Sequence, residues 1–195
     1  MELPEGYKTE EVIIDATRAN LKALTLMLPV GILTGVPFYL LWNENLTVGA
    51  FKSFTADNEV WMTYGTVIAL FVIMAGIVMH EFIHGVTWAR FARKGFASIR
   101  FGVLWKELTP YCHCREPLRV KHYITGAAMP AVVLGILPSL AALATGNIFV
   151  MAFGLFFTVA AAGDFMIIDL LRKENPNDLV QDHPSKIGYF IFRKD

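Results

Sequence analysis

The sequence has 195 residues, of which 55% are hydrophobic and only 17% are charged, and its formal net charge is zero. Soluble domains are about one quarter charged. The missing charges leave long uncharged runs here, so the composition indicates an integral membrane protein whose surroundings are the lipid bilayer. A neutral chain is not typical of a general nucleic-acid binder, and we expect no nucleic-acid partner. A chain of this length forms one domain, and residues 1–195 are predicted to be a single integral-membrane unit.

Four stretches are apolar and long enough to cross a bilayer, which takes about 20 residues. They are residues 23–42, 60–89, 123–144 and 148–171. The last two are separated by a short Thr-Gly-Asn turn and are predicted to form an antiparallel pair. This pattern predicts an all-α membrane protein with four transmembrane helices, followed by a tail over residues 172–195.

Lys and Arg are distributed unevenly between the segments that connect these spans. Residues 43–59 carry only Lys52, whereas residues 90–122 carry eight such side chains and the tail carries five. Positively charged loops stay in the cytoplasm. The chain is therefore predicted to be a multi-pass protein of the cell membrane, with both termini and the 90–122 loop in the cytoplasm.

The second predicted span ends in the pattern His80-Glu81-x-x-His84. Ionisable groups at membrane depth are costly and usually mark a functional site. Residues four apart lie close together on one helix face, so both imidazoles can bind one metal ion. Glu81 projects about 100° from His80, which suits a water bound to the metal rather than the metal itself. Catalytic zinc sites use three protein ligands and leave a fourth position for water.

Depth in the membrane indicates which residue is the third ligand. The midpoint of the His pair lies eight residues before Arg90, and Asp164 lies eight residues before Arg172. Asp164 is therefore expected at the same depth as the pair. Asp169 lies nearer to Arg172; it is the alternative ligand, or else it pairs with Arg172 or Lys173. A hydrogen-bonded His pair without a metal is the remaining alternative.

The segments HEFIHG, CHCREPL, GDFMIIDLL and DHPSKIG resemble a small group of bacterial membrane proteins known as putative zincin peptidases. The chain is also similar to the site-2-protease-like intramembrane zinc metalloproteases. The resemblance implies one zinc ion per chain, held by His80, His84 and Asp164, with Glu81 as the general base. It implies a membrane metallopeptidase of a bacterial inner membrane, which cuts a membrane protein or membrane peptide near the cytoplasmic side.

The loop between the second and third spans contains a different periodicity. Apolar side chains alternate over residues 99–105, which predicts a small cytoplasmic-side β-hairpin between helices 2 and 3, with its turn at residues 106–107. A free strand edge can bind a substrate in extended form through main-chain hydrogen bonds. The alternative is a hairpin that only packs on the membrane face. Phe101, Val103 and His113 are the candidate substrate-binding residues.

Two further groups of polar residues have open interpretations. By residue type, a second zinc site could be formed by Cys112, His113, Cys114 and His122, although their spacing is unlike that of common zinc motifs. The Asp182-His183 pair either caps the cytoplasmic entrance or forms a surface turn. Residues 187–192 are expected to lie on the membrane or to add a strand to the hairpin.

A function from another class also fits these residues, namely a non-proteolytic zinc-binding membrane protein such as a transporter, a sensor or an inactive scaffold. Transporters usually carry ligands along a path and often contain internal repeats, and the sequence has a single cluster and no visible repeat. Glu81 disfavours a scaffold, because zinc binding alone does not require it. The sequence leaves open the substrate, the oligomeric state and the choice between zinc and another divalent metal.

Overall fold

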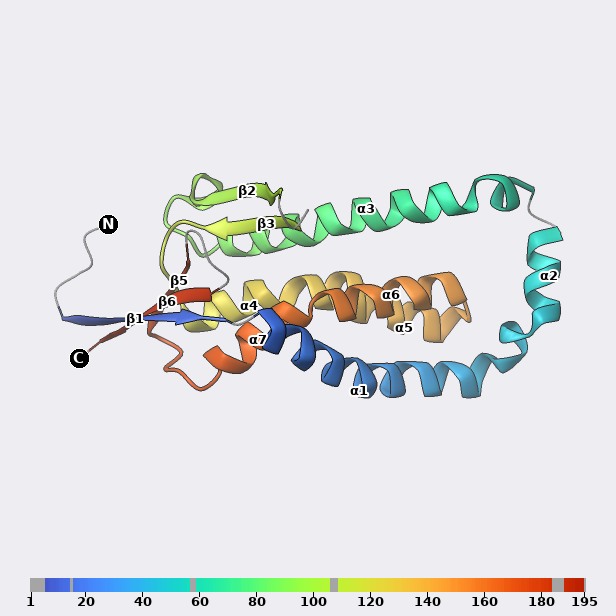
Figure 1. Cartoon of the computed structure of the whole chain (residues 1–195), viewed down its shortest axis with the longest axis horizontal. Coiled ribbons are helices and arrows are strands. Elements are labelled where there is room, and N and C mark those ends of the chain that lie inside the picture. Colours follow the sequence, from blue (N-terminus) through green and yellow to red (C-terminus); the bar gives the residue numbers. More distant parts are fainter. Residues whose placement is uncertain (1–5, 15, 57–58, 106–108, 184–187, 195) are drawn as a thin grey trace. The chain divides into compact units, whose positions relative to one another are not determined.

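A computed structural model describes residues 6–14, 16–56, 59–105, 109–183 and 188–194 of the chain. Figure 1 shows the helices and strands. The helices are α1 (Ala16–Trp42), α2 (Val48–Ala56), α3 (Glu59–Ala89), α4 (Val120–Pro130), α5 (Leu137–Thr145), α6 (Ile148–Ala160) and α7 (Ala162–Leu171), with a π-helical segment η3 (Ala131–Ile136) and two short 3-10 segments, η1 (Asn43–Leu46) and η2 (Gly95–Ser98). The strands are β1 (Tyr7–Ile13), β2 (Ile99–Leu104), β3 (Thr109–Cys114), β4 (Leu118–Arg119), β5 (Leu179–Asp182) and β6 (Gly188–Lys194).

The chain forms two compact units, which are described separately. The first unit comprises Met1–Ala23, His80–Pro130 and Ala161–Asp195. The second comprises Leu24–Met79 and Ala131–Ala160. The first unit contains all six strands and the residues predicted to form the metal site.

The structure supports two to three of the four predicted membrane spans. α3 and the segment Val120–Thr145, which contains α4, η3 and α5, are each long and apolar enough to cross a membrane. α6 and α7 meet the same criterion only as a pair, bent by 46° at the break between them. The span predicted at residues 23–42 stays a prediction, because the apolar stretch Pro29–Trp42 is only part of α1 and is by itself shorter than a span. The direction of each span and the side of the termini also stay predictions.

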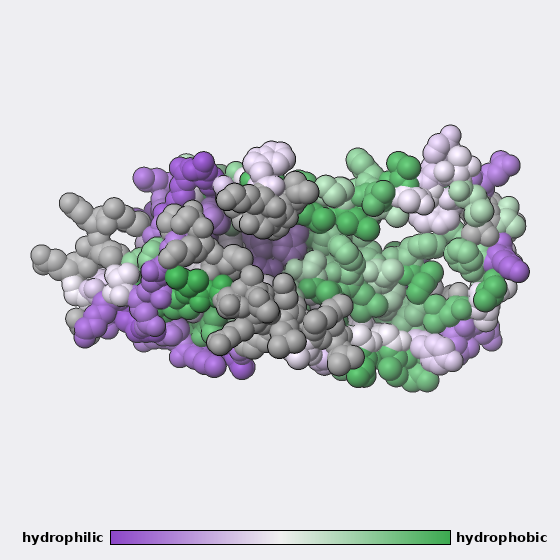
Figure 2. All heavy atoms as spheres, viewed as in Figure 1, coloured by the Kyte–Doolittle hydropathy of each residue, from purple (hydrophilic) through white to green (hydrophobic). Residues whose placement is uncertain are grey.

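The surface of α3 is consistent with a lipid environment. Only 11% of its most apolar stretch is buried within the protein. Its exposed apolar side chains include Val67, Leu70, Phe71 and Val78. Figure 2 shows apolar residues over the helices of the second unit and polar residues gathered near the strands of the first. A contiguous apolar surface of this kind requires an apolar surrounding.

The span predicted over residues 148–171 is interrupted. α6 ends at Ala160, and α7 begins at Ala162 after Ala161, whose ψ of 11° lies outside the α-helical range. Asp164 consequently lies in the first turn of α7. The unpaired N–H groups and the positive end of the helix dipole favour a negative side chain in that turn.

The strands form two separate sheets in the first unit. β2 and β3 make an antiparallel hairpin in which Phe101 pairs with Cys112, and its predicted turn at residues 106–107 lies outside the described residues. A second antiparallel sheet has the order β1-β6-β5-β4. The all-α fold class is therefore incomplete, because the protein is mostly helical with two small sheets.

The four-stranded sheet also corrects the expectation for the end of the chain. β6 pairs with β1 over its whole length, from Gly188 opposite Ile13 to Lys194 opposite Tyr7, and its other edge pairs with β5. It does not extend the hairpin. The sequence does not predict this pairing, because β1 and β6 lie almost a whole chain length apart and local periodicity carries no information on pairing over that distance.

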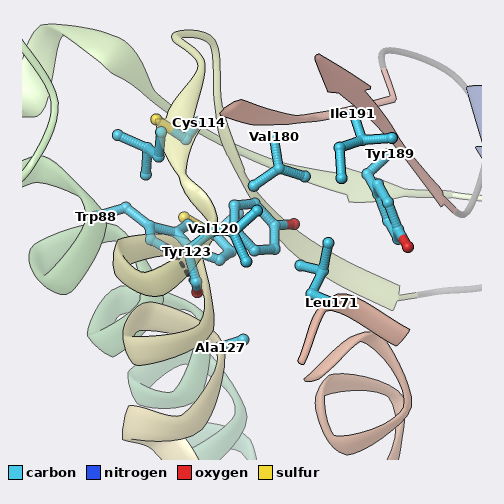
Figure 3. Close-up of a cluster of buried hydrophobic side chains, with 11 residues drawn as sticks. Trp88, Cys114, Val120, Tyr123, Ala127, Leu171, Val180, Tyr189 and Ile191 are labelled. Carbon is cyan, nitrogen blue, oxygen red and sulfur yellow. Dashed lines mark hydrogen bonds between the residues drawn. The ribbon is translucent and has the colours of Figure 1, made fainter. Parts of the chain in front are cut away.

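Side chains from three helices and both sheets form the core of the first unit (Figure 3). Trp88 of α3, Tyr123 of α4 and Leu171 of α7 meet Val180 of β5 and Ile191 of β6 there. Each of these side chains is at most 4% exposed. The core therefore joins the helices that carry the predicted ligands to the strands at both ends of the chain.

Asp182 connects the two sheets to α4 within this core. Its carboxylate accepts hydrogen bonds from the main-chain N–H of Cys114, at 2.9 Å, and from the hydroxyl of Tyr123. Burial raises the pKa of this carboxyl above its ordinary value. The adjacent His183 is also buried, and its Nε2 lies 3.0 Å from Oε1 of Glu11 on β1. The Asp182-His183 pair is therefore part of the interior and not a surface turn.

The second unit contains the predicted hairpin of α5 and α6. Gly146 ends α5 in the left-handed conformation, with φ of 72°, and the side chain of Asn147 accepts the main-chain N–H of Phe149 at 3.0 Å. Gly154 of α6 lies against Ser139 of α5, where a Cβ would overlap the Ser139 hydroxyl. Small residues thus allow these two helices to pack closely.

We expect the substitution Asp182→Ala to destabilise the protein. It removes the acceptor for two buried donors, and an unsatisfied buried donor costs about 1–3 kcal/mol. Thermal unfolding of the purified chain in detergent measures the effect. The control is Glu10→Gln, which removes the exposed ion pair between Glu10 and Arg193. We expect it to change the free energy of unfolding by no more than about 1 kcal/mol. An Asp182→Ala protein as stable as the wild type would contradict this account.

Candidate metal centre

The two imidazoles of the His80-Glu81-x-x-His84 pattern lie side by side on α3. Both side chains are buried, with exposures of 8% for His80 and 4% for His84. Their rings are 4.9 Å apart between centroids, and their Nε2 atoms are separated by 3.2 Å. The helix therefore presents two ring nitrogens to one point, as the four-residue spacing predicts.

Asp164 completes a group of three. Its Oδ2 lies 3.2 Å from Nε2 of His80, and its Oδ1 lies 3.2 Å from Nε2 of His84. One ligand atom from each residue lies within 4.8 Å of the others, and this is the one such group of three or more metal-ligating side chains among the described residues. All three residues belong to the first unit. Tertiary structure thus brings an Asp from α7 to a His pair on α3.

The spacing of the three ligands is suited to zinc. Zn–N and Zn–O bonds are about 2.0–2.2 Å long, and the ligand atoms of a tetrahedral site then lie about 3.3–3.6 Å apart. The two Nε2 atoms lie 3.2 Å apart, and each lies 3.2 Å from a different oxygen of the Asp164 carboxylate, which is close to the spacing of zinc ligands. These three side chains would hold a zinc ion, and three protein ligands are the number found in catalytic zinc sites.

The protonation state of His84 is set by a neighbouring main-chain group. Its Nδ1 lies 2.9 Å from the carbonyl oxygen of Gly126 on α4. Because a carbonyl only accepts hydrogen bonds, Nδ1 carries a proton, and Nε2 is the ring nitrogen left to face His80 and Asp164. The neutral ring with its proton on Nδ1 is the tautomer required of a metal ligand at Nε2. By contrast, Nδ1 of His80 is buried and has no hydrogen-bond partner among the described residues.

Glu81 lies beside this cluster and outside the group of three. Its carboxylate accepts a hydrogen bond from the main-chain N–H of Cys112 on β3. The hairpin approaches α3 closely at Gly85, where a Cβ would overlap the side chain of Phe101. One strand of the hairpin therefore holds the carboxylate that the sequence assigns to acid–base chemistry.

Asp169, the alternative ligand, has a different environment. Its Oδ1 lies 2.7 Å from a guanidinium nitrogen of Arg172 in the same segment. It does not belong to the group formed by His80, His84 and Asp164. The geometry therefore favours Asp164 over Asp169 as the third ligand.

The predicted substrate-binding residues lie on the hairpin. Phe101 is 44% exposed and stacks against Phe82 of α3, with centroids 6.4 Å apart, and Val103 is 39% exposed on the same strand. His113 packs against Tyr111, with ring centroids 4.5 Å apart. Substrate binding by these residues stays a prediction.

The residues considered for a second zinc site do not gather. His122 stacks on Phe91 of α3 at 4.2 Å between centroids. Cys112 and Cys114 are buried free thiols in the hydrophobic core, and the Sγ of Cys114 is 3.4 Å from the carbonyl oxygen of Glu116. These side chains therefore form core and packing contacts.

A buried group of two histidines and one aspartate, with a glutamate next to the first histidine, is the set of side chains expected in a zinc peptidase. Residues 73–179, more than half of the chain, match the model of family DUF3267, described as putative zincin peptidase. The chain belongs to this family. No curated protein and no solved structure shows significant similarity to the chain.

Family membership supports the general prediction of a zinc-dependent metallopeptidase and of zinc as the cofactor. The matched segment includes His80, Glu81, His84 and Asp164. Three residues around the site were not singled out from the sequence, namely Trp88, Gly126 and Tyr123. The sequence signal that marks Gly126 is Pro130, four residues later.

The thiols of Cys112 and Cys114 are expected to be unreactive in the folded protein. Burial raises the pKa of both, that of Cys114 to about 11, and the thiolate is the reactive and zinc-binding form. We expect maleimide labelling of the native protein near neutral pH to be at least about tenfold slower than labelling after unfolding. Rapid native labelling of both thiols would contradict their placement in the core.

Proposed function

We propose that the chain is a zinc-dependent intramembrane peptidase of the site-2-protease-like kind, with one zinc ion held by His80, His84 and Asp164 and with Glu81 as the general base. The substrate is a membrane protein or membrane peptide, cut near the cytoplasmic side of a bacterial inner membrane. The observation that carries the proposal is that His80 and His84, on a helix apolar enough to cross a membrane, converge with Asp164 of α7 beside Glu81, with one ligand atom from each within 4.8 Å of the others.

A zinc ion at this site supplies Lewis acidity, which polarises a scissile carbonyl and lowers the pKa of a water molecule. The side chains of the protein hold the ligands in place and transfer the proton. The His84 ring is held by the Gly126 carbonyl with Nε2 turned to the cluster. Glu81 takes a proton from the attacking water and returns it to the leaving amine nitrogen.

The surroundings of the site favour a substrate that comes from the bilayer. Phe82, next to Glu81 on α3, is 46% exposed, and Phe101 of the hairpin is 44% exposed against it. These rings offer an apolar surface on which an apolar segment can pack. The β2–β3 hairpin provides main-chain groups beside the site, which favours a substrate in extended form.

The metal content of the detergent-purified chain tests the ligand assignment. We expect about one zinc per chain in the wild type, measured by mass spectrometry, and loss of the metal in His80→Ala and Asp164→Ala, since three protein ligands are the usual minimum. Asp169→Asn is the matched control and is expected to retain zinc. A zinc-free wild type after purification without chelator would favour an inactive scaffold.

Glu81→Gln separates metal binding from chemistry. We expect this variant to retain zinc and to cleave about 10²–10⁴-fold more slowly, because a general base contributes that much to rate. Cleavage of transmembrane peptides, reconstituted in liposomes with the full chain, is followed by mass spectrometry of the fragments. Unchanged cleavage by Glu81→Gln would refute the general-base role, and zinc flux into liposomes that is insensitive to this change would favour a transporter.

A further inference from the structure

The hydrogen bond from His84 Nδ1 to the Gly126 carbonyl depends on an unusual feature of α4. In an α-helix the carbonyl of residue i accepts the N–H of residue i+4, and for Gly126 that residue is Pro130. Proline has no N–H. The carbonyl of Gly126 therefore lacks the donor that the helix would ordinarily supply, although α4 continues to Pro130.

The carbonyl of Gly126 lies in a buried part of the protein. Pro130 is among the fully buried side chains, and Gly126 is buried as well. A buried carbonyl without a donor is costly. Nδ1 of His84 lies 2.9 Å away and supplies this donor. The imidazole and the Gly126 carbonyl thus each gain a hydrogen-bond partner.

Gly126 is also suited to the close approach of α3. A Cβ at this position would overlap the indole of Trp88. The indole stacks on the His84 ring, with centroids 5.0 Å apart and an interplanar angle of 14°, and its Nε1 donates to the carbonyl of Tyr123 at 3.1 Å. Two main-chain carbonyls of α4, three residues apart, thus hold two side chains of α3.

We propose that Pro130 is a positioning residue of the metal centre. By withholding a main-chain N–H from the carbonyl of Gly126, it reserves that carbonyl for Nδ1 of His84, and so fixes the tautomer that turns the Nε2 lone pair to the metal. The assignment rests on the proposed zinc site, but its first consequence, the tautomer of His84, exists without metal or catalysis.

The substitutions Pro130→Ala and Pro130→Val restore an N–H that competes with His84 for the carbonyl. Val keeps most of the buried volume and guards against a cavity effect. We expect zinc affinity, measured on the full chain in detergent by competition with a chromophoric chelator, to fall about 10–100-fold, which is the usual effect of losing an outer partner of a ligating histidine. Thermal stability of the metal-free variants is not expected to fall in parallel, because a helical hydrogen bond is regained.

Pro138→Ala is the matched control. It is the same substitution in the same apolar segment, but Pro138 lies at the start of α5, where a proline is well tolerated. We expect its zinc affinity to equal that of the wild type. An equal loss in Pro138→Ala and Pro130→Ala would overturn the proposal, since it would indicate a general response to removing proline.

The second measurement is the tautomer of His84 in the metal-free protein. Long-range ¹H–¹⁵N spectra of the histidine-labelled chain, assigned with a His84→Gln variant, distinguish a proton on Nδ1 from one on Nε2. We expect Nδ1 to carry a proton in the wild type and in Pro138→Ala, whatever the state of Nε2, and Nδ1 to lose this proton in part in the Pro130 variants.

The outcomes distinguish this proposal from the proposed function. A wild-type chain with Nδ1–H at His84 but no zinc would refute the zinc peptidase and leave the role of Pro130 supported. A wild-type chain in which Nδ1 of His84 carries no proton would overturn the role of Pro130, whether or not the variants fold. Zinc binding and a His84 spectrum that are both unchanged in the Pro130 variants would overturn it as well.

Discussion

The meeting of the Asp164 carboxylate with two imidazoles is the interaction on which the rest of the site depends. Ionisable groups next to apolar helices are costly unless they share a partner, and here each imidazole lies 3.2 Å from the other and 3.2 Å from one oxygen of the Asp164 carboxylate. The first turn of α7 favours the negative charge of Asp164 through its free N–H groups. The break between α6 and α7 is therefore part of the site, because it creates that turn.

The first unit provides a frame that keeps the three ligands together. α3, α4 and α7 share one core with strands from both sheets, and Asp182 links the hairpin to α4 through Cys114 and Tyr123. β6 is held between β1 and β5. The two ends of the chain, which carry no ligand, thereby support the helices that do. The strands therefore contribute to the site although none of them carries a predicted metal ligand.

The sequence predicted some features well, for identifiable reasons. The His pair and Glu81 are close in sequence on one helix, so helical geometry alone indicates that both imidazoles reach one point. Asp164 was selected by comparing distances to the charged ends of two spans, and the structure places it at the His pair. The hairpin at β2 and β3 was visible as a period of two. The four-stranded sheet was not, because β1 and β6 pair across nearly the whole chain and neither shows a distinctive pattern.

The sequence alone indicated which residues could hold a metal ion and that they lie on apolar helices, because residue type, helical spacing and hydropathy are local properties. Only the tertiary structure decided how these residues are completed. The structure pairs Asp169 with Arg172, which leaves Asp164 as the candidate third ligand. It also places the Gly126 carbonyl of α4 next to Nδ1 of His84. It also turned Asp182 inward as an acceptor for two donors. Each of these outcomes depends on which donor lies opposite which acceptor across distant segments, and a linear pattern does not contain that information.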